Sequence, residues 1–481
     1  MMQRKILFLQ GPPSLFWRQL CSHFQAAGAE THRINFSLGD WAYWRKRGAV
    51  NYRGRFSRWA EFLRHYLIQH GITDILYYAD RLPYHAVARE LAQALGIRTY
   101  AVEFGYLRPH WITLERGGMG SLSHFPDDPD VIRAIAKRSG PYVPSNDTHY
   151  HHTFGQEAFN EVLYNLLTSL VPYFFPLYRP DKRYWPLVDY LSWPPSSLFK
   201  KLHDPRRVAV LDQWQHEKRR YWLMALQIQA DYQLRANSHY EHQSHTIEEV
   251  IASFARHARA EDCLVIKLHP LDNGLERWHS VTARIAKQYG VAERVLTVHE
   301  CDLNHAVKQC QGVVTVNSTV GLISLRAHKP VKALGVAVYD VAGLTHQGPL
   351  DTFWQTPEPV DHALLTDFIS ALAATIQVRG SFYNEQGRKA ASEEIVRRVL
   401  EDRVNGLGAF VTPPPRLARA LRNNVPIHGS LRKSGIGPAA YDTPETRLTT
   451  PGTAAPANDA TPAHQDAPAT RPVPEEPVQA S

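Results

Sequence analysis

The chain has 481 residues, of which 44% are apolar and 11% aromatic, and it carries a formal net charge of +8 at neutral pH. A chain of this length exceeds what one hydrophobic core usually serves, so we expect two sizeable globular domains. No run of about eighteen uncharged apolar residues occurs, which excludes a transmembrane helix, and the N-terminal stretch shows no signal-peptide cleavage region. The sequence therefore predicts a cytoplasmic protein, and the scattered positions of its four cysteines predict reduced thiols.

The first half of the chain alternates short apolar runs with longer amphipathic stretches, a pattern typical of parallel sheets flanked by helices. The predicted strands are residues 5–10, 30–36, 74–79 and 98–103, and the predicted helices include residues 58–71 and 84–96. The second half repeats the scheme, with predicted strands at residues 221–228, 263–269, 294–299, 312–317 and 330–335. We therefore predict an α/β fold with two Rossmann-like domains, residues 1–200 and 205–403, joined through an aromatic, proline-rich segment near residues 172–206.

Two further segments follow these domains. Residues 404–440 contain no acid, and "RLARALR" places Arg416, Arg419 and Arg422 at helical spacing, which predicts a basic amphipathic helix able to touch an anionic membrane. A solvated helix lying across the domains is an equally good interpretation. Residues 441–481 are rich in Pro, Ala and Thr and contain six acids against two arginines, so we predict a disordered tail.

Functional residues in open parallel sheets lie at the carboxyl ends of the strands. The first predicted strand leads into "QGPPSLFW", where Gly11 permits close approach of a ligand. This turn is not G-x-G-x-x-G, so dinucleotide binding is not expected. The strand at residues 74–79 delivers Asp80 and His85 to the same edge of the sheet.

The next strand carries Glu103 into "EFGYLRPHWITLERGG", which also contains Arg108 and Glu115. Arg108 and Glu115 could form a structural ion pair. The density of ionisable and aromatic side chains on this connection also favours a sugar-binding surface.

In the second half, "LQIQADYQLR" places Asp231 among Gln227, Gln229 and Gln233 and close to Arg235. Amide groups that donate hydrogen bonds to a carboxylate keep it ionised, which suits a nucleophile or an electrostatic stabiliser. A helix N-cap is the alternative role for this aspartate.

The stretch "VIKLHPLDNG" presents Lys267 and His269 at the end of a strand, and Pro270 ends the strand. A histidine at a strand end is often structural. Another strand ends in Asn317, Ser318 and Thr319, followed by Gly321 in the first turn of a predicted helix. Free backbone N–H groups and hydroxyls at a helix N-terminus bind phosphate, so we predict a nucleotide-phosphate site that includes His269.

Seven of these stretches resemble, in order, the motifs of the bacterial capsule polysaccharide biosynthesis family, and within it the single-module β-Kdo transferases of group 2 capsule systems. They are "FLQGPPSLFW", "RINFSLGDWAYW", "DILYYADRLPYH", "EFGYLRPHWITLERGG", "LQIQADYQLR", "KLHPLDNG" and "VNSTVGLISLRAHKPVKALGVAVYDVAGLTHQGPLDTFW". The resemblance covers residues 4–400 and leaves the tail outside.

The resemblance implies a GT-B-like glycosyltransferase that uses CMP-Kdo to add the first Kdo of the capsule linker to lysophosphatidylglycerol, with retention of configuration. It also implies peripheral placement at the cytoplasmic face of the inner membrane, in a complex with the Kdo-extending transferase and an ABC transporter. No cofactor besides the donor is expected. No metal is expected either, because the sole Asp-x-Asp, residues 128–130, is interpreted as a helix cap.

The resemblance assigns the nucleophile to Asp231, and either Glu103 or Asp80 could accept the proton of the acceptor. The donor-binding residues would be Lys267, Gln229, His269, Pro270, Asn317, Ser318, Thr319 and Gly321. The sugar and acceptor would contact Gly11, His85, Arg108 and Arg235, because Kdo is an anion that needs cations.

Two other functions remain open on the sequence. The chain could be a non-catalytic component of capsule assembly or export, or a transferase for another nucleotide sugar. Nucleic-acid binding is not expected, because the excess basic charge is not interleaved with stacking aromatic residues in a recognisable module.

Overall fold

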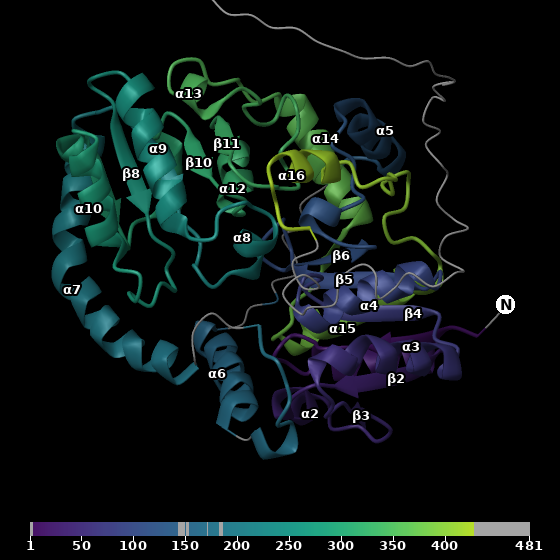
Figure 1. Ribbon diagram of the computed structural model, residues 1–481. Helices are drawn as coiled ribbons and strands as arrows, with labels where there is room; N and C mark the ends of the chain where they lie inside the picture. Colours follow the sequence, from purple (N-terminus) through teal and green to yellow (C-terminus); the bar gives the residue numbers. More distant parts are fainter. Residues whose placement is uncertain (1–2, 143–149, 151–152, 171, 182–185, 428–481) are drawn as a thin grey trace, which may run out of the picture. The chain divides into compact units, whose positions relative to one another are not determined.

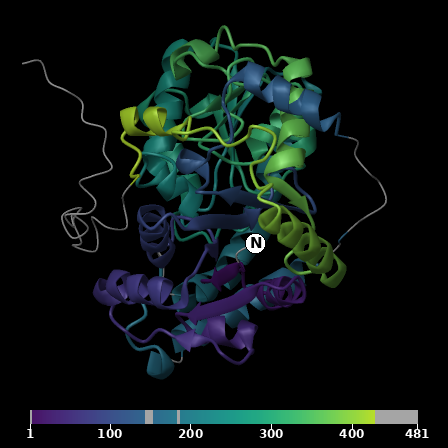
Figure 2. The same cartoon turned by 90° about the vertical axis from the view of Figure 1, so that its right-hand side faces the viewer.

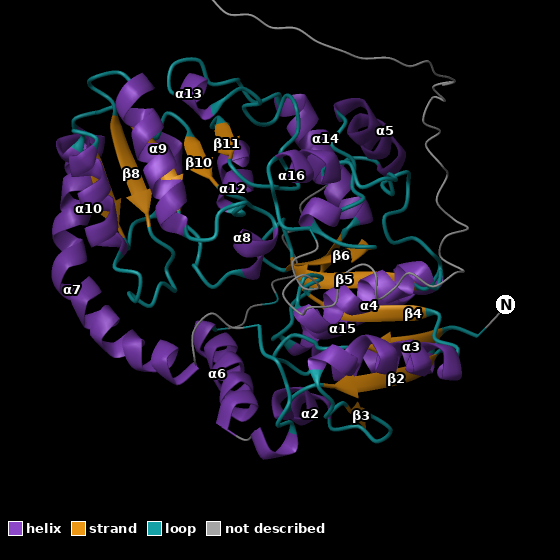
Figure 3. Cartoon of the chain, in the orientation of Figure 1, coloured by secondary structure: helices purple, strands orange, loops and turns teal. Residues whose placement is uncertain are grey.

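The computed structural model describes residues 3–142, 150, 153–170, 172–181 and 186–427 (Figure 1). All of these residues belong to one compact unit. Two mainly parallel sheets with helices packed against them organise this unit (Figure 3), and they confirm the predicted α/β fold class. The predicted tail, residues 441–481, lies outside the described residues.

The first sheet has seven strands in the order β12-β6-β5-β4-β1-β2-β3. Their bounds are β1 Lys5–Phe8, β2 Glu30–Asn35, β3 Val50–Asn51, β4 Asp74–Tyr78, β5 Arg98–Phe104, β6 Trp111–Arg116 and β12 Gln377–Arg379. Strands β3, β2, β1, β4 and β5 are parallel, whereas β6 is antiparallel to both β5 and β12. The strand order of the parallel part reverses between β1 and β4, which is where such sheets bind ligands.

Helices with one apolar face cover this sheet. They are α1 Phe16–Ala26, α2 Leu38–Trp44, α3 Trp59–His70, α4 Pro83–Ala94 and α15 Glu385–Leu400. On α1 the buried Phe16, Leu20 and Phe24 recur every four residues, and they share a hydrophobic cluster with Ile395 and Val399 of α15. The periodicity of the sequence thus sets which face of each helix is buried.

The second sheet has five parallel strands in the order β11-β10-β7-β8-β9. Their bounds are β7 Tyr221–Ala225, β8 Cys263–Lys267, β9 Val295–Val298, β10 Val313–Thr315 and β11 Val331–Ala333. Leu223 packs in one hydrophobic cluster, while its neighbours Trp222 and Met224 pack in another, so both faces of β7 are buried. Burial on both faces explains the continuous apolar runs in the sequence. The order reverses between β7 and β10.

The remaining helices connect the sheets or pack on the second one. They are α5 Pro129–Ser139, α6 Phe154–Leu170, α7 Pro186–His216, α8 Tyr232–Ala236, α9 Gln243–His257, α10 Trp278–Gln288, α11 Leu303–Gln309, α12 Val320–Arg326, α13 Leu350–Phe353, α14 His362–Thr375 and α16 Leu417–Arg422. Helix α5 comes from the first half of the chain but packs against α14 from the second half (Figure 2).

The predicted strands are all present, although most end one to three residues earlier than expected. Three strands of the first sheet, β3, β6 and β12, were not predicted. The prediction that residues 103–118 form one long connection is wrong, because residues 111–116 form β6 and return along β5. The predicted domain boundary at residue 403 does not follow the sheets either, because β12 and α15 join the first sheet and its helix layer.

The segment around α16 holds parts of both halves together. Arg416 is buried and donates to the carbonyl oxygens of Phe125 and Pro126 in the first half and of Ala337 and Val338 in the second. This geometry matches the interpretation of a helix that lies across the domains.

The other two arginines of the predicted basic helix differ from Arg416. The guanidinium of Arg419 lies 2.6 Å from a carboxylate oxygen of Asp340, and Arg422 is exposed. The prediction that all three arginines face a membrane is therefore wrong for Arg416, because its buried guanidinium donates hydrogen bonds to backbone carbonyl oxygens.

Candidate functional site

Several predicted site residues lie at the carboxyl edges of the two sheets, next to the points where the strand order reverses. Asp80 follows β4, whereas Asp231 and Asn317 follow β7 and β10. Glu103 belongs to β5, next to β4. Loops from the two edges meet, because side chains of α8, which follows β7, contact β5 directly.

Asp231 is the N-cap of α8, the alternative role that the sequence allowed. One carboxylate oxygen accepts the backbone N–H of Gln233 at 2.9 Å, and the other accepts from the Gln227 amide at 3.3 Å. Burial nevertheless raises the pKa of Asp231, against the lowering effects of these hydrogen bonds and of the Arg108 and Arg235 charges. Desolvation therefore outweighs the hydrogen bonds from the amide donors, which were expected to dominate the pKa of Asp231.

Glu103 lies close to Asp231 although the two acids belong to different sheets. Its carboxylate accepts hydrogen bonds from the Tyr232 hydroxyl and from the Gln233 amide nitrogen, the latter at 2.5 Å. Burial, with a further contribution from the negative charge of Asp231, raises the pKa of Glu103 to about 7. The structure thus brings together two of the three predicted catalytic acids, and one of them has a pKa suited to proton transfer at neutral pH.

Arg108 is the cation that acts on both acids. Its positive charge lowers the pKa of Glu103 and that of Asp231, and its guanidinium lies 5.2 Å from the centre of the Phe104 ring. Arg108 also donates to the carbonyl oxygen of Gly105, whereas Glu115 bonds to Ser123 and Tyr106. The alternative ion pair between Arg108 and Glu115 does not form in the described part of the chain.

A network of amides fixes the loop after β7, and it includes Asn317, which was predicted to bind the donor. Gln227 donates to Asn317 at 2.8 Å, and the Asn317 amide donates to the backbone carbonyl of Gln233 at 3.0 Å. Asn237 donates to the Gln233 side chain and accepts from Ser121. The glutamines around Asp231 were the available signal, but only the fold shows that they connect the sheets.

Asp80 and His85 are buried beneath this region. One oxygen of Asp80 accepts the backbone N–H of Met119, and burial raises its pKa. His85 lies inside α4, where burial lowers its pKa to about 4 and its ring stacks on Tyr77. The predicted exposure of His85 to a sugar is therefore wrong, because Pro83 begins α4 two residues earlier and turns the imidazole into the core.

Glu115 is a second buried acid at this edge, and it should make stability depend on pH. Burial raises its pKa to about 8, from the ordinary 4.5, so between these two pH values the folded state binds more protons than the unfolded state. The contribution of Glu115 to stability must then fall as pH rises through this window, by up to about 1.4 kcal/mol per pH unit. We expect thermal denaturation between pH 5 and pH 8 to show a shallower decline for Glu115→Gln than for the parent. The exposed Glu293→Gln serves as control, and equal slopes for Glu115→Gln and the parent would contradict the assignment.

The predicted phosphate site at the end of β10 has a different local geometry from the one expected. Ser318 caps the next turn by accepting the N–H of Val320, and its carbonyl accepts from the Tyr339 hydroxyl at 2.6 Å. Thr319 is the N-cap residue of α12 but makes no side-chain capping bond. A Cβ on Gly321 would lie 2.3 Å from the Tyr339 oxygen, so packing of this ring, and not access for a ligand, requires glycine there.

The other predicted donor-binding residues lie around β8 and α9. Lys267 is buried and donates to the carbonyl oxygens of Leu268 and His299, and the side chain of Gln229 bonds to the backbone at the start of α9. These bonds assign both side chains a structural task, which corrects the prediction that they face the donor.

His269 and Pro270 lie at the end of β8. Nδ1 of His269 accepts the N–H of Leu271, which leaves the proton on Nε2, and Pro270 is exposed. Strand β7 separates β8 from β10, so His269 and Ser318 lie two strands apart on one edge. Arg235, predicted to contact sugar, forms a two-pronged ion pair with Asp181 at 3.2 and 2.9 Å.

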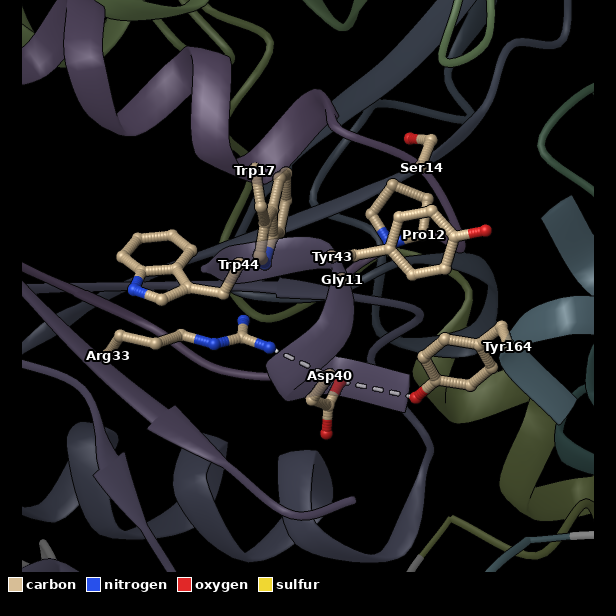
Figure 4. Close-up of a pocket in the computed structure, with 9 residues that line it drawn as sticks. All are labelled: Gly11, Pro12, Ser14, Trp17, Arg33, Asp40, Tyr43, Trp44 and Tyr164. Atoms are coloured by element: carbon tan, nitrogen blue, oxygen red, sulfur yellow. Dashed lines mark hydrogen bonds and ion pairs between the residues drawn. The ribbon is translucent and has the colours of Figure 1, made fainter. Parts of the chain in front are cut away.

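A small pocket lies at the ends of β1 and β2, with an interior of about 10 Å³ that suffices for one water-sized molecule. Figure 4 shows Arg33 and Tyr164 pointing towards Asp40 from opposite sides. Gly11 lines this pocket, but a Cβ there would lie 2.6 Å from the Trp17 ring. The close approach that Gly11 permits is therefore that of Trp17.

Among the described residues, no cluster of three or more His, Cys, Asp or Glu side chains could hold a metal ion. The Asp-x-Asp stretch confirms the interpretation as a cap, because Asp128 accepts the backbone N–H groups of Asp130 and Val131 at the start of α5.

Comparison with known proteins places this geometry in context. A family model described as capsule polysaccharide biosynthesis protein matches residues 73–383. The capsule polysaccharide export protein KpsS of Escherichia coli is 34% identical over 381 residues, which cover 79% of this chain and 97% of that protein. The capsule polysaccharide modification protein LipB of Neisseria meningitidis serogroup B is 30% identical over 388 residues, covering 79% and 92%. Among solved structures, KpsC of Thermosulfurimonas dismutans, a beta Kdo 2,7 transferase, aligns with a TM-score of 0.37 at 13% identity, over 82% of this chain and 98% of that one.

Proposed function

Because the chain belongs to the capsule polysaccharide biosynthesis family, we propose that it is a retaining β-Kdo glycosyltransferase. The proposed reaction transfers Kdo from CMP-Kdo to lysophosphatidylglycerol, as the first sugar of a capsule linker. The observation that carries the proposal is the contact between the two sheets at Glu103 and Tyr232, which sets two acids with raised pKa values side by side.

The two acids suit a double displacement. Asp231 in its ionised form attacks the anomeric carbon, the bond to the phosphate of CMP breaks, and a glycosyl ester forms with inversion. The acceptor hydroxyl then attacks this carbon from the opposite face, gives its proton to Glu103 and releases Asp231, so the two inversions retain the configuration. The negative charge of Asp231 contributes to the raised pKa of Glu103. Formation of the glycosyl ester removes this charge and lowers the pKa of Glu103, so that Glu103 releases its proton to solvent and then accepts the proton of the acceptor hydroxyl.

The charges around the acids suit an anionic sugar. The positive charge of Arg108 lowers the pKa of both acids, and we propose that Arg108 binds the carboxylate of Kdo. His269, with its proton on Nε2, and Ser318 are the candidates for the phosphate of CMP. A phosphate monoester that departs with such donors needs no proton and no cofactor besides the donor sugar.

The proposed function also implies where the chain acts and which proteins act beside it. A lipid acceptor requires access to the inner membrane from the cytoplasm, and no helix among the described residues is long and apolar enough to cross a membrane. For such an acceptor we propose a peripheral position at the inner membrane, beside the Kdo-extending transferase and the ABC transporter of a capsule system.

The decisive experiment is a transfer assay with purified protein. A fluorescent lysophosphatidylglycerol analogue is mixed with CTP, Kdo and a CMP-Kdo synthetase, and mass spectrometry should show addition of one Kdo. UDP-sugars in place of CMP-Kdo should give no product. Transfer from a UDP-sugar alone would identify a transferase for another donor. No transfer from any donor, with intact protein, would favour a non-catalytic component of capsule assembly.

A further inference from the structure

Large apolar side chains are exposed together on one part of the molecule. We call the apolar patch the group Trp41 on α2, Phe159 and Val162 on α6, and Tyr173, Phe174 and Leu177 in the turn that follows α6. Tyr173 is 89% exposed and Phe159 is 65% exposed, which is extreme for aromatic side chains in a folded chain. Large apolar side chains that are exposed in such number on neighbouring elements usually mark a site of interaction.

The elements that carry the patch contact one another. Helix α2 packs on α6, where the Tyr43 hydroxyl donates to the side-chain oxygen of Asn160 at 2.8 Å. The segment after α6 lies on the loop that follows α2, because Arg53 lies over the Phe175 ring and Arg179 lies over the Phe56 ring, at 5.9 and 5.1 Å. Figure 1 shows α2, α6 and β3 together at the lower edge of the first sheet.

Strong positive charge borders the patch. Residues 45–58, the basic segment, contain five arginines and one lysine and no acid. Arg45, Arg47 and Arg55 are exposed. Helix α6 itself carries Glu157 and Glu161, so the positive charge is concentrated on the loop beside the patch and not on the helix.

We propose that the apolar patch and the basic segment form the surface by which this chain docks on an anionic lipid bilayer. Exposed aromatic and aliphatic side chains insert at the level of the headgroups, and adjacent arginines pair with anionic phosphates. A symmetric contact of this surface with a second copy would place the two basic segments against each other, whereas an anionic bilayer supplies the opposite charge.

The position of this surface would allow it to present a lipid acceptor for the proposed sugar transfer. Helices α2 and α6 carry the patch on the outside and line the pocket at the ends of β1 and β2 with Tyr43, Trp44 and Tyr164 on the inside (Figure 4). Docking would therefore bring the bilayer to the carboxyl edge of the first sheet, on which a lipid acceptor must be presented. This use rests on the proposed function, but the docking itself does not.

Flotation of the full-length protein with vesicles tests the surface. The parent should bind vesicles of phosphatidylcholine with 30% phosphatidylglycerol, more weakly at 500 mM than at 50 mM salt, and should not bind phosphatidylcholine alone. A charge variant, Arg45→Glu with Arg47→Glu and Arg55→Glu, should lower the partition coefficient at least about 100-fold, since each cation near the surface contributes about fivefold. An apolar variant, Phe159→Ser with Tyr173→Ser and Phe174→Ser, should lower it at least about tenfold.

Matched variants on other surfaces control for non-specific effects. Arg256→Glu with Arg284→Glu and Lys287→Glu on α9 and α10, and Ile68→Ser with Leu275→Ser, should change binding by less than about twofold. The proposal is overturned if the charge variant and the apolar variant bind vesicles like the parent. It is also overturned if binding is lost instead with Arg419→Glu and Arg422→Glu on α16. It is also overturned if the variants only convert a dimer to a monomer in sedimentation.

A transfer assay with a short-chain, water-soluble acceptor separates this surface from the chemistry. Both the charge variant and the apolar variant should turn over that acceptor like the parent. If the parent binds vesicles through this surface yet transfers no sugar, the docking stands and the proposed function fails.

Discussion

Replacing Asp231 with asparagine should reduce sugar transfer by at least about 1000-fold while leaving the fold and CMP binding unchanged. The amide cannot form the glycosyl ester, but it keeps the shape of the side chain. Asparagine is as good an N-cap as aspartate, so its oxygen can still accept the Gln233 N–H that begins α8. We expect the thermal midpoint to move by no more than a few degrees. Product formation is measured by mass spectrometry, and CMP binding by calorimetry.

The chain offers a matched control for this substitution. Asp128 caps α5 with the same geometry on the exposed surface, so Asp128→Asn should retain full activity. Mixing the parent with CMP-Kdo and no acceptor should leave a Kdo adduct on the peptide that contains residues 221–235. If Asp231→Asn turns over normally, the double displacement at this residue is wrong, and Glu103 becomes the acid to test.

Removing the carboxylate of Asp40 should destabilise the protein by about 3–5 kcal/mol, the usual cost of leaving a buried charge without its partner. Arg33 is 3% exposed and Asp40 is 2% exposed, and the guanidinium of Arg33 lies 3.2 Å from the carboxylate of Asp40. This carboxylate also accepts from the Phe36 N–H and the Tyr164 hydroxyl, so Asp40→Ala loses several bonds at once. Urea denaturation should show a much lower midpoint.

An exposed ion pair gives the comparison for this prediction. Arg133 and Asp130 form an i,i+3 pair at 3.1 Å on the surface of α5, and Asp130→Ala should cost less than about 1 kcal/mol. A double substitution, Arg33→Met with Asp40→Leu, should recover much of the lost stability, because it removes the unpaired charge. Equal urea midpoints for Asp40→Ala and Asp130→Ala would show that the buried pair contributes no more than an exposed one.

Local patterns in the sequence were sufficient for all the parallel strands except the two-residue β3, and for their order of appearance. Strands such as Cys263–Lys267 are buried on both faces, so they leave a short continuous apolar run that needs no knowledge of distant residues. Caps behave in the same way, because Asp128 and Asp231 satisfy backbone donors only two or three residues away. The carboxyl ends of the strands, and with them Asp80, Asp231 and Asn317, could therefore be located before the fold was known.

The sequence by itself determined the two mainly parallel α/β sheets and the strand ends where the candidate site lies. Only the tertiary structure decided which side chains meet there. Tyr232 and Glu103 are 129 residues apart, and β12 joins the first sheet from the far end of the chain. The same packing buried His85, engaged Lys267 with backbone carbonyls and drew Arg416 into the interface between the halves. Periodicity indicates which face of an element is apolar. These contacts join residues far apart in the sequence and depend on how the two hydrophobic cores pack together, which no local pattern encodes.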